Sequence, residues 1–330
     1  LFLGVGSMSC YFIFFLTGTP ILNKIEVLIP QLTVLGYLNE SSASVFKRDY
    51  CGNRPNIFKL ESLNTKLRNM CMVKRNKDEV GIDLPAGTRT IIETEITNRK
   101  QYNLILQDLA QYLDKIKKMN PIDITKSMRA EALVRTNHLK RTAAEGYKAD
   151  VVEFCQNALE NGQNILLFCT SHELLDYYQN TLKTHYRIDG TVSKEKRQQL
   201  IDAYQAETVP TIFIISIRSG GVGVTLTKAD YVVYAEKDWV PAYHDQGTSR
   251  THRIGRTEHV NEYFFVAKDT IDSRIMEIME EKRKITEVGT GANDIATTIT
   301  TSVYKDVMKR EFDYDTANVE DVESGLPALL

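Results

Sequence analysis

This chain of 330 residues contains few cysteines and one tryptophan, and it has almost no excess of charge of either sign. Its five cysteines form no CxxC pair, and their spacing fits neither a disulfide framework nor a zinc site. This cysteine usage favours a reducing, intracellular setting. The formal net charge is only −2, because 41 Lys and Arg residues are matched by 43 Asp and Glu residues. The chain therefore lacks an overall basic field, and any contact with nucleic acid must come from local patches.

Residues 1–23 carry no charge and are long enough in principle to cross a bilayer. The segment nevertheless contains Gly4, Gly6, Gly18 and Pro20, and no basic region precedes its most apolar part at 11–16. We expect no membrane contact and interpret 11–16 as a buried parallel strand that ends at a turn. The alternative is a membrane-tethered protein, which detergent fractionation would reveal.

From about residue 145 the chain alternates short β-branched or aromatic runs with amphipathic helices. The runs predict strands at 165–169, 186–189, 211–216, 231–236 and 262–267, and the helices include 173–183 and 194–204, the second with Ser193 as its N-cap. Upstream, the pattern predicts irregular helices up to about residue 75, a strand at 88–96 and a helix at 99–118. The fold class predicted is α/β, a doubly wound parallel sheet covered on both faces.

Two clusters follow predicted strands, at the edge of the sheet where ligands of such folds bind. In the first, residues 216–225, three glycines within four positions let backbone amides approach a phosphate. The alternative is that these glycines only form a tight turn after the strand and bind no ligand. The second, residues 246–256, contains Arg250 and Arg253, which share one face if this stretch is helical and could then clamp a multiply charged anion. The alternative for the second cluster is a solvated basic face, and His252 alone is more often structural than catalytic.

In this order, the clusters resemble the C-terminal lobe of Snf-type (sucrose-non-fermenting) helicase-like ATPases of superfamily two, which translocate on DNA or remodel chromatin. The resemblance is carried by SIRSGGVGVTLTKAD (216–230), DWVP (238–241), QGTSRTHRIGR (246–256) and RIDGTVSKEKRQQLIDAY (187–204). Upstream, LTGTPILNKIEVL (16–28) and MCMVKRNKDEVGIDLPAG (70–87) resemble further family motifs. The match runs from about residue 14 to residue 284.

The resemblance implies a RecA-like helicase C-terminal lobe at 151–290. It further implies an incomplete end of a first RecA-like lobe with a helical insertion at 1–120, and a connecting segment at 121–150. The remaining residues, 291–330, are expected to form an acidic, loosely ordered tail.

The resemblance also assigns roles to individual residues. Arg250 and Arg253 would be arginine fingers that reach the β- and γ-phosphates of ATP, and Gln246 would orient the fingers or a water. The residues expected at the nucleotide are Gly221, Gly223, Thr17 and Thr19. The residues expected to couple the nucleotide site to DNA are Ser216, Arg218 and Trp239.

Several positions depart from the family pattern, among them Ile217, Val240 and Ser249, so the hydrogen-bond partners of the fingers are open. The sequence also contains no GxxxxGK[ST] motif, and its one Asp-Glu pair, Asp78-Glu79, lies in a polar segment. ATP with Mg²⁺ would therefore be shared with a missing first lobe, and we expect no appreciable ATP hydrolysis by this chain alone. This is the pattern of a truncated or split product.

The expected partners are double-stranded DNA and the missing N-terminal ATPase lobe, in cis or in trans. The expected location is the nucleus in a eukaryote and the cytoplasm in a bacterium or phage. The alternative function is a catalytically inactive RecA-like lobe that binds DNA or a partner, or an inert remnant with exposed apolar surface. A dinucleotide-dependent dehydrogenase is disfavoured, because no predicted strand is followed by GxGxxG with an acidic residue about twenty positions later.

Overall fold

The computed structural model describes residues 12–16, 25–51, 57–73, 87–120, 123, 125–219, 225–251, 259–289 and 303–313. These residues divide into two compact units. Described residues within Leu1–Gly81, Val240–Ala242 and Ile278–Tyr304 form the first, and those within Ile82–Trp239, Tyr243–Glu277 and Lys305–Leu330 form the second. Within the described ranges, no helix is both long and apolar enough to span a bilayer.

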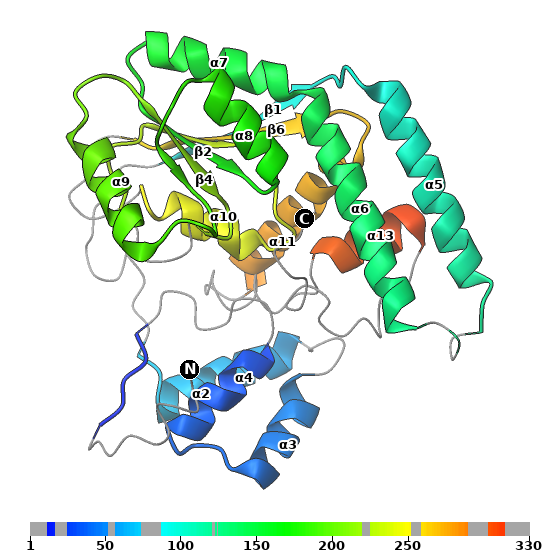
Figure 1. Cartoon of the computed structure of the whole chain (residues 1–330). Coiled ribbons are helices and arrows are strands. Elements are labelled where there is room, and N and C mark those ends of the chain that lie inside the picture. Colours follow the sequence, from blue (N-terminus) through cyan, green and yellow to red (C-terminus); the bar gives the residue numbers. More distant parts are fainter. Residues whose placement is uncertain are drawn as a thin grey trace. The chain divides into compact units, whose positions relative to one another are not determined.

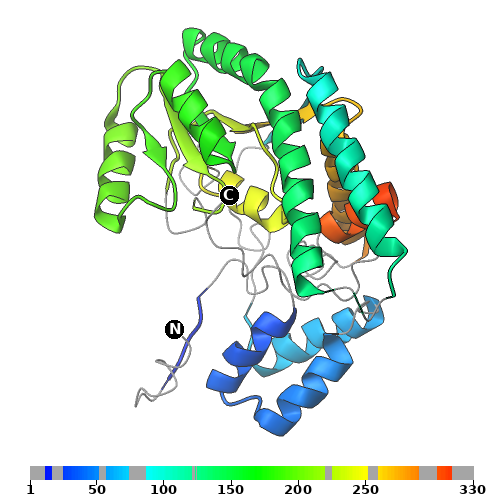
Figure 2. The same cartoon turned by 45° about the vertical axis from the view of Figure 1, so that its right-hand side comes forward.

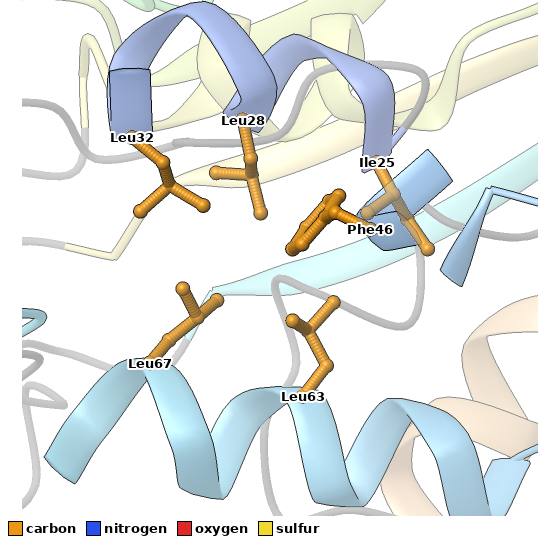
Figure 3. Packing of buried hydrophobic residues seen from close by; sticks show 6 residues of the cluster. All are labelled: Ile25, Leu28, Leu32, Phe46, Leu63 and Leu67. Carbon is orange, nitrogen blue, oxygen red and sulfur yellow. The ribbon is translucent and has the colours of Figure 1, made fainter. Parts of the chain in front are cut away.

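The first unit contains a short 3-10 helix η1 (Ile25–Val27) and the α-helices α2 (Leu28–Val34), α3 (Glu40–Tyr50) and α4 (Ile57–Met70). Asn39 caps α3, since its side chain accepts a hydrogen bond from the Ser42 N–H while Ser42 Oγ accepts one from the Asn39 N–H. The side chains at the centre come from all four helices and point toward one another, as Figure 3 shows: Ile25, Leu28, Leu32, Phe46, Leu63 and Leu67. The helices predicted for this part of the chain thus build a small apolar core.

The prediction of a buried strand at 11–16 is wrong for the part of it that the structure describes. Residues 12–16 have no strand assignment, and none of the strand pairs in the described chain involves them. The side chains of Phe12, Phe14 and Leu16 are exposed, with Phe14 at 80%. An extended apolar run becomes a strand only where a neighbouring strand takes up its backbone N–H and C=O groups, and sequence periodicity does not reveal that neighbour.

The second unit is built on a six-stranded sheet in the order β1-β6-β5-β2-β4-β3, in which all the pairs are parallel (Figure 1). The strands are β1 (Thr88–Thr94), β2 (Ile165–Cys169), β3 (Arg187–Ile188), β4 (Ile212–Ser216), β5 (Tyr231–Tyr234) and β6 (Asn261–Ala267). Every residue of β2 is buried, as are four of the five in β4, which is typical of central parallel strands. The predicted fold class is confirmed.

Helices flank this sheet. The helices α7 (Lys148–Glu160) and α8 (His172–Thr181) pack against β2 and β4 respectively, and α9 (Lys194–Ala206) begins at the predicted N-cap Ser193, whose hydroxyl accepts from the Lys196 N–H. Two long helices, α5 (Arg99–Lys117) and α6 (Lys126–Gly146), lie side by side in Figures 1 and 2. The remaining helices are α10 (Pro241–Thr248), α11 (Ile271–Gly289) and α13 (Val303–Phe312).

The edge strand β1 comes from far upstream in the sequence. It pairs with β6 over its whole length, from Thr88 opposite Asn261 to Thr94 opposite Ala267. The Arg89 guanidinium forms an ion pair of 2.7 Å with Glu262 and lies 4.9 Å from the centroid of the Phe264 ring. Both β1 and α5 lie in the range 1–120 that we expected to hold a first lobe, and in the structure they are part of the unit that contains the six-stranded sheet.

Candidate functional site at the carboxyl edge of the sheet

The site expected from the sequence lies where β2, β4 and β5 end side by side. Cys169 at the end of β2 is opposite Ser216 at the end of β4, and Phe168 is opposite Tyr234 at the end of β5. Because the three strands are parallel, the segments that follow them leave the sheet at the same edge. The residues at 170–171, 217–219 and 235–239 are therefore neighbours in space.

Ser216 and Arg218 lie at a tight turn after β4, in which the Ser219 N–H donates to the Ser216 carbonyl at 2.9 Å. The Arg218 side chain is 51% exposed, and its Nε lies 2.9 Å from the carboxylate of Asp238, which is buried. The predicted DNA-coupling residue Arg218, which follows β4, is thus held by a carboxylate that follows β5, on the other side of β2 in the sheet.

One main-chain hydrogen bond joins the end of the glycine-rich segment to the arginine cluster. Gly221 and Gly223 lie outside the described residues, as do Arg253, His252, Thr17 and Thr19. The Leu226 N–H donates to the carbonyl of Arg250 at 3.0 Å. The residue that directly follows the first predicted cluster is therefore hydrogen-bonded through the main chain to Arg250 of the second cluster.

Gln246 lies in α10, whereas Arg250 lies in the turn after it, so a helix that would place Arg250 and Arg253 on one face does not extend to Arg250. The helix ends at Thr248. The Ser249 N–H still donates to the Asp245 carbonyl four residues earlier, but those of Arg250 and Thr251 donate to carbonyls three residues earlier. The Ser249 hydroxyl also donates to the Gln246 carbonyl at 2.8 Å. Short hydroxyl side chains that bond to nearby backbone groups compete with helix continuation, which accounts for the early end.

Gly247 allows α10 to lie close against the sheet. A Cβ at this position would lie 2.8 Å from the Tyr234 hydroxyl and 2.9 Å from Cζ of Phe168. The Tyr234 hydroxyl in turn donates to the carbonyl of His244 at 2.7 Å. The position of Gln246 relative to the strand ends thus depends on a glycine next to it in the sequence.

Glu236, which the sequence interpretation did not select, binds the start of α8. Its buried Oε2 accepts hydrogen bonds from the N–H groups of Thr170 and Ser171, from the Ser171 hydroxyl and from the Cys169 thiol, at 2.7–2.8 Å. Burial alone would raise the pKa of Glu236, but the charge of Lys140 and these hydrogen bonds outweigh it and lower the pKa. A carboxylate of this protein therefore occupies the positive end of α8.

Lys237 and Asp272 form a fully buried ion pair beside it. Lys237 Nζ lies 2.5 Å from Asp272 Oδ2 and also donates to the Phe265 carbonyl in β6. The Tyr147 hydroxyl donates to the same Asp272 oxygen at 3.0 Å. Burial lowers the pKa of Lys237, and the Asp272 carboxylate opposes that change. The pair fastens the segment after β5 to the first turn of α11.

Trp239, the only tryptophan, is buried and faces α6. Its Nε1 donates to Asn137 Oδ1 at 2.8 Å, and the Lys140 ammonium lies 5.5 Å from the centroid of its ring. Lys140 also donates to the Lys237 carbonyl at 2.6 Å. These contacts hold the residue that the sequence assigned to DNA coupling within the protein.

His244 in α10, like Glu236 and Lys237, is a residue of this site that the sequence interpretation did not select. Its side chain is fully buried between the rings of Tyr234 and Phe264, and its Nε2 accepts from the Asp238 N–H at 3.2 Å. Burial lowers the pKa of His244 to about 3. One signal could have pointed to this region: three consecutive charged residues, 236–238, directly follow an apolar strand, at the edge where ligands bind.

The described acidic residues at this edge are not arranged to hold a metal ion. Within the described ranges, no group of three or more His, Cys, Asp or Glu side chains could hold a metal ion. The acidic side chains at this edge, Glu236, Asp238 and Asp272, are each bound to cations or N–H donors of the chain. These residues do not fit Mg²⁺, and we assign no step to that ion here.

Residues 149–257 match the family model described as the helicase conserved C-terminal domain. "Helicase SWR1" of Kluyveromyces lactis is 28% identical over 316 residues, which are 88% of this chain and 20% of that protein. "Helicase SWR1" of Saccharomyces cerevisiae is 37% identical over 146 residues, 43% of this chain and 10% of that protein. Residues 149–257 of this chain are a helicase C-terminal domain, similar to those of Snf2-type helicases. The chain spans a tenth to a fifth of the length of these two relatives.

A solved structure agrees with the fold of this helicase domain. The "Sulfolobus solfataricus SWI2/SNF2 ATPase core domain" superposes with a TM-score of 0.50 and 22% sequence identity, covering 93% of this chain and 66% of that one. At this identity the likeness concerns the fold alone. The matched residues 149–257 contain β2 to β5 and α10, so the carboxyl-edge site described above lies within the helicase C-terminal domain.

Proposed function

We propose that this chain acts as the second lobe of a DNA-dependent ATPase of the Snf2 type. In this proposal Arg250 and Arg253 act as arginine fingers on the triphosphate of an ATP molecule that another lobe binds, and Gln246 orients them. Arg218 and Ser216 lie toward the DNA backbone. The ATP-bound lobe is supplied in cis or in trans, and the chain alone hydrolyses no appreciable ATP.

The observation that carries the proposal is the hydrogen bond from Leu226 N–H to the Arg250 carbonyl. It brings the end of the glycine-rich segment next to an arginine at the edge of a parallel sheet, and Arg218, whose side chain is 51% exposed, belongs to the same segment. An anion at this edge would meet backbone N–H groups and guanidinium groups together, a combination that suits phosphate. Arginine adds bidentate geometry and a charge that persists at all physiological pH values.

The test is ATP hydrolysis in trans. The chain is mixed with a separately purified first lobe of a Snf2-type relative and duplex DNA, and phosphate release is measured with malachite green. We expect hydrolysis only in the mixture, and a loss of about a thousandfold or more with Arg250→Ala or Arg253→Ala. Arg48→Ala, at an exposed arginine of α3, is the matched control and leaves the rate unchanged.

Two results would contradict the proposal. Hydrolysis in the mixture that survives both substitutions would remove the role of the fingers. Hydrolysis by the chain alone, abolished by Arg253→Ala, would show that the chain binds and cleaves ATP without a separate first lobe. DNA binding that is sensitive to salt and indifferent to ATP, with no hydrolysis in the mixture, would instead favour the alternative of an inactive DNA-binding lobe.

A further inference from the structure

Four consecutive residues after β5 each contact a different part of the second unit. Glu236 binds the start of α8, Lys237 binds Asp272 at the start of α11, and Trp239 binds Asn137 in α6. Asp238 lies between them, with its carboxylate on Arg218 and its N–H on His244 in α10. All four side chains are buried. The Asp238 carboxylate is therefore fixed by its neighbours on both sides.

We propose that Asp238 is a positioning residue that orients the Arg218 guanidinium toward a phosphate of the DNA backbone. The contact is made at Nε, 2.9 Å from Asp238 Oδ2, while about half of the Arg218 side chain faces solvent. A guanidinium has five donors in a fixed planar fork, so a carboxylate at Nε sets the direction in which the Nη groups point. This inference rests on the proposed function, because it assigns a DNA contact to the same edge of the sheet.

The geometry distinguishes this role from general electrostatics. Asp238 is an acidic residue beside a proposed polyanion site, so Coulomb repulsion alone predicts that its removal tightens DNA binding. A positioning role predicts the reverse, because an arginine that loses its anchor must be ordered at the moment of binding, at a cost in side-chain entropy. The direction of the change is thus informative.

The experiment measures duplex DNA binding by the full chain through fluorescence anisotropy, over a series of salt concentrations. We expect Arg218→Ala to weaken binding about tenfold and to reduce the salt slope by about one phosphate contact. We expect Asp238→Ala to weaken binding about three- to tenfold in the same direction, and Asp238→Asn, whose amide oxygen can still accept from Nε, to retain most of the affinity. The double variant is expected to bind no more weakly than Arg218→Ala alone.

A spectroscopic readout separates orientation from folding. In the absence of DNA, the Nε–H resonance of Arg218 in ¹⁵N-edited NMR is expected to exchange slowly with water in the unaltered chain and in Asp238→Asn, and rapidly in Asp238→Ala. Trp239 fluorescence reports whether each variant is folded. A merely structural role for Asp238 would lower affinity equally in the presence and absence of Arg218.

Several outcomes would overturn the inference. They are unchanged or tighter DNA binding by a folded Asp238→Ala variant, additive losses in the double variant, and an Nε–H resonance that does not respond to Asp238→Ala. Each of these leaves the proposed function intact, provided that the unaltered chain binds duplex DNA. Absence of duplex binding by the unaltered chain would overturn the DNA contacts of the proposed function, and this inference with them.

Discussion

His244 should make the second unit sensitive to acid. Its imidazole is fully buried between two aromatic rings, and burial lowers its pKa from 6.5 to about 3. In the unfolded chain the same group titrates near its ordinary pKa of about 6.5. Between these two pKa values the unfolded state binds the proton and the folded state does not. The free energy of unfolding is therefore highest above pH 6.5, with respect to this group, and decreases progressively as the pH falls.

The size of the effect follows from the two pKa values. Relative to pH 7, linkage predicts a loss of about 2 kcal/mol in the free energy of unfolding at pH 5 and about 3 kcal/mol at pH 4 from this residue. The substitution His244→Gln removes the titrating group and keeps a side-chain oxygen that can accept from the Asp238 N–H. Its cost at pH 7 should therefore shrink, or reverse, as the pH is lowered.

The assay is urea unfolding followed through Trp239, the only tryptophan, which lies in the same unit. The difference in unfolding free energy between His244→Gln and the unaltered chain is plotted from pH 7 to pH 4, so that the titration of other groups cancels. His185→Gln, at an exposed histidine of the same unit, is the matched control for the exchange of an imidazole for an amide. A flat difference for His244→Gln would refute the reasoning.

Three further predictions concern residues at the same edge of the sheet. Lys237→Met leaves the Asp272 carboxylate buried without its cation and should lower the free energy of unfolding in urea by about 3–5 kcal/mol. Combining it with Asp272→Leu should recover part of that loss, and equal losses in the single and double variants would contradict this. Gly247→Ala places a Cβ against two aromatic side chains and should lower the free energy of unfolding by about 1–3 kcal/mol. Gly190→Ala is the control, because a Cβ there meets nothing within 4 Å, and it should change the free energy of unfolding by less than about 0.5 kcal/mol. Similar thermal midpoints for the two variants would refute the steric argument. Iodide should not quench Trp239 fluorescence until the chain unfolds, because the indole is buried, and efficient quenching of the folded chain would contradict that position.

The sequence predicted the sheet well wherever local pattern decides structure. The strand at 165–169 has the predicted bounds, and those at 211–216 and 262–267 differ by one residue at one end. These runs are apolar, are bounded by polar residues and alternate with helices, which is the pattern of a parallel sheet. The strand at 231–236 is shorter than predicted: β5 ends at Tyr234, and beyond it the Ala235 carbonyl accepts from the Tyr147 hydroxyl and the Glu236 carboxylate binds the start of α8.

Features that depend on distant partners were not predicted. Nothing in the run 88–96 shows that it joins β6 as an edge strand, because strand pairing is set by tertiary contacts. The polar segment 121–150 was taken as a connection, yet 21 of its residues form α6, whose Lys140 and Asn137 bind the segment after β5. Likewise, Glu236, Lys237 and His244 are ordinary residues in the sequence, and their roles follow only from burial and from their partners in space.

The pairing of β1 with β6 has a consequence for how the chain is made. Thr88 and Asn261 are 173 residues apart, so at ribosomal rates of about 5–20 residues per second the first strand waits about 10–35 s for its partner to be synthesised. Through that interval the nascent polypeptide carries an unmatched β-segment, an opportunity for chaperone capture or for intermolecular association. Recombinant pieces cut at the limits of the matched region, 149–257, would leave out both strands and expose the flank of β5. Soluble expression therefore calls for boundaries that retain both Thr88 and Ala267.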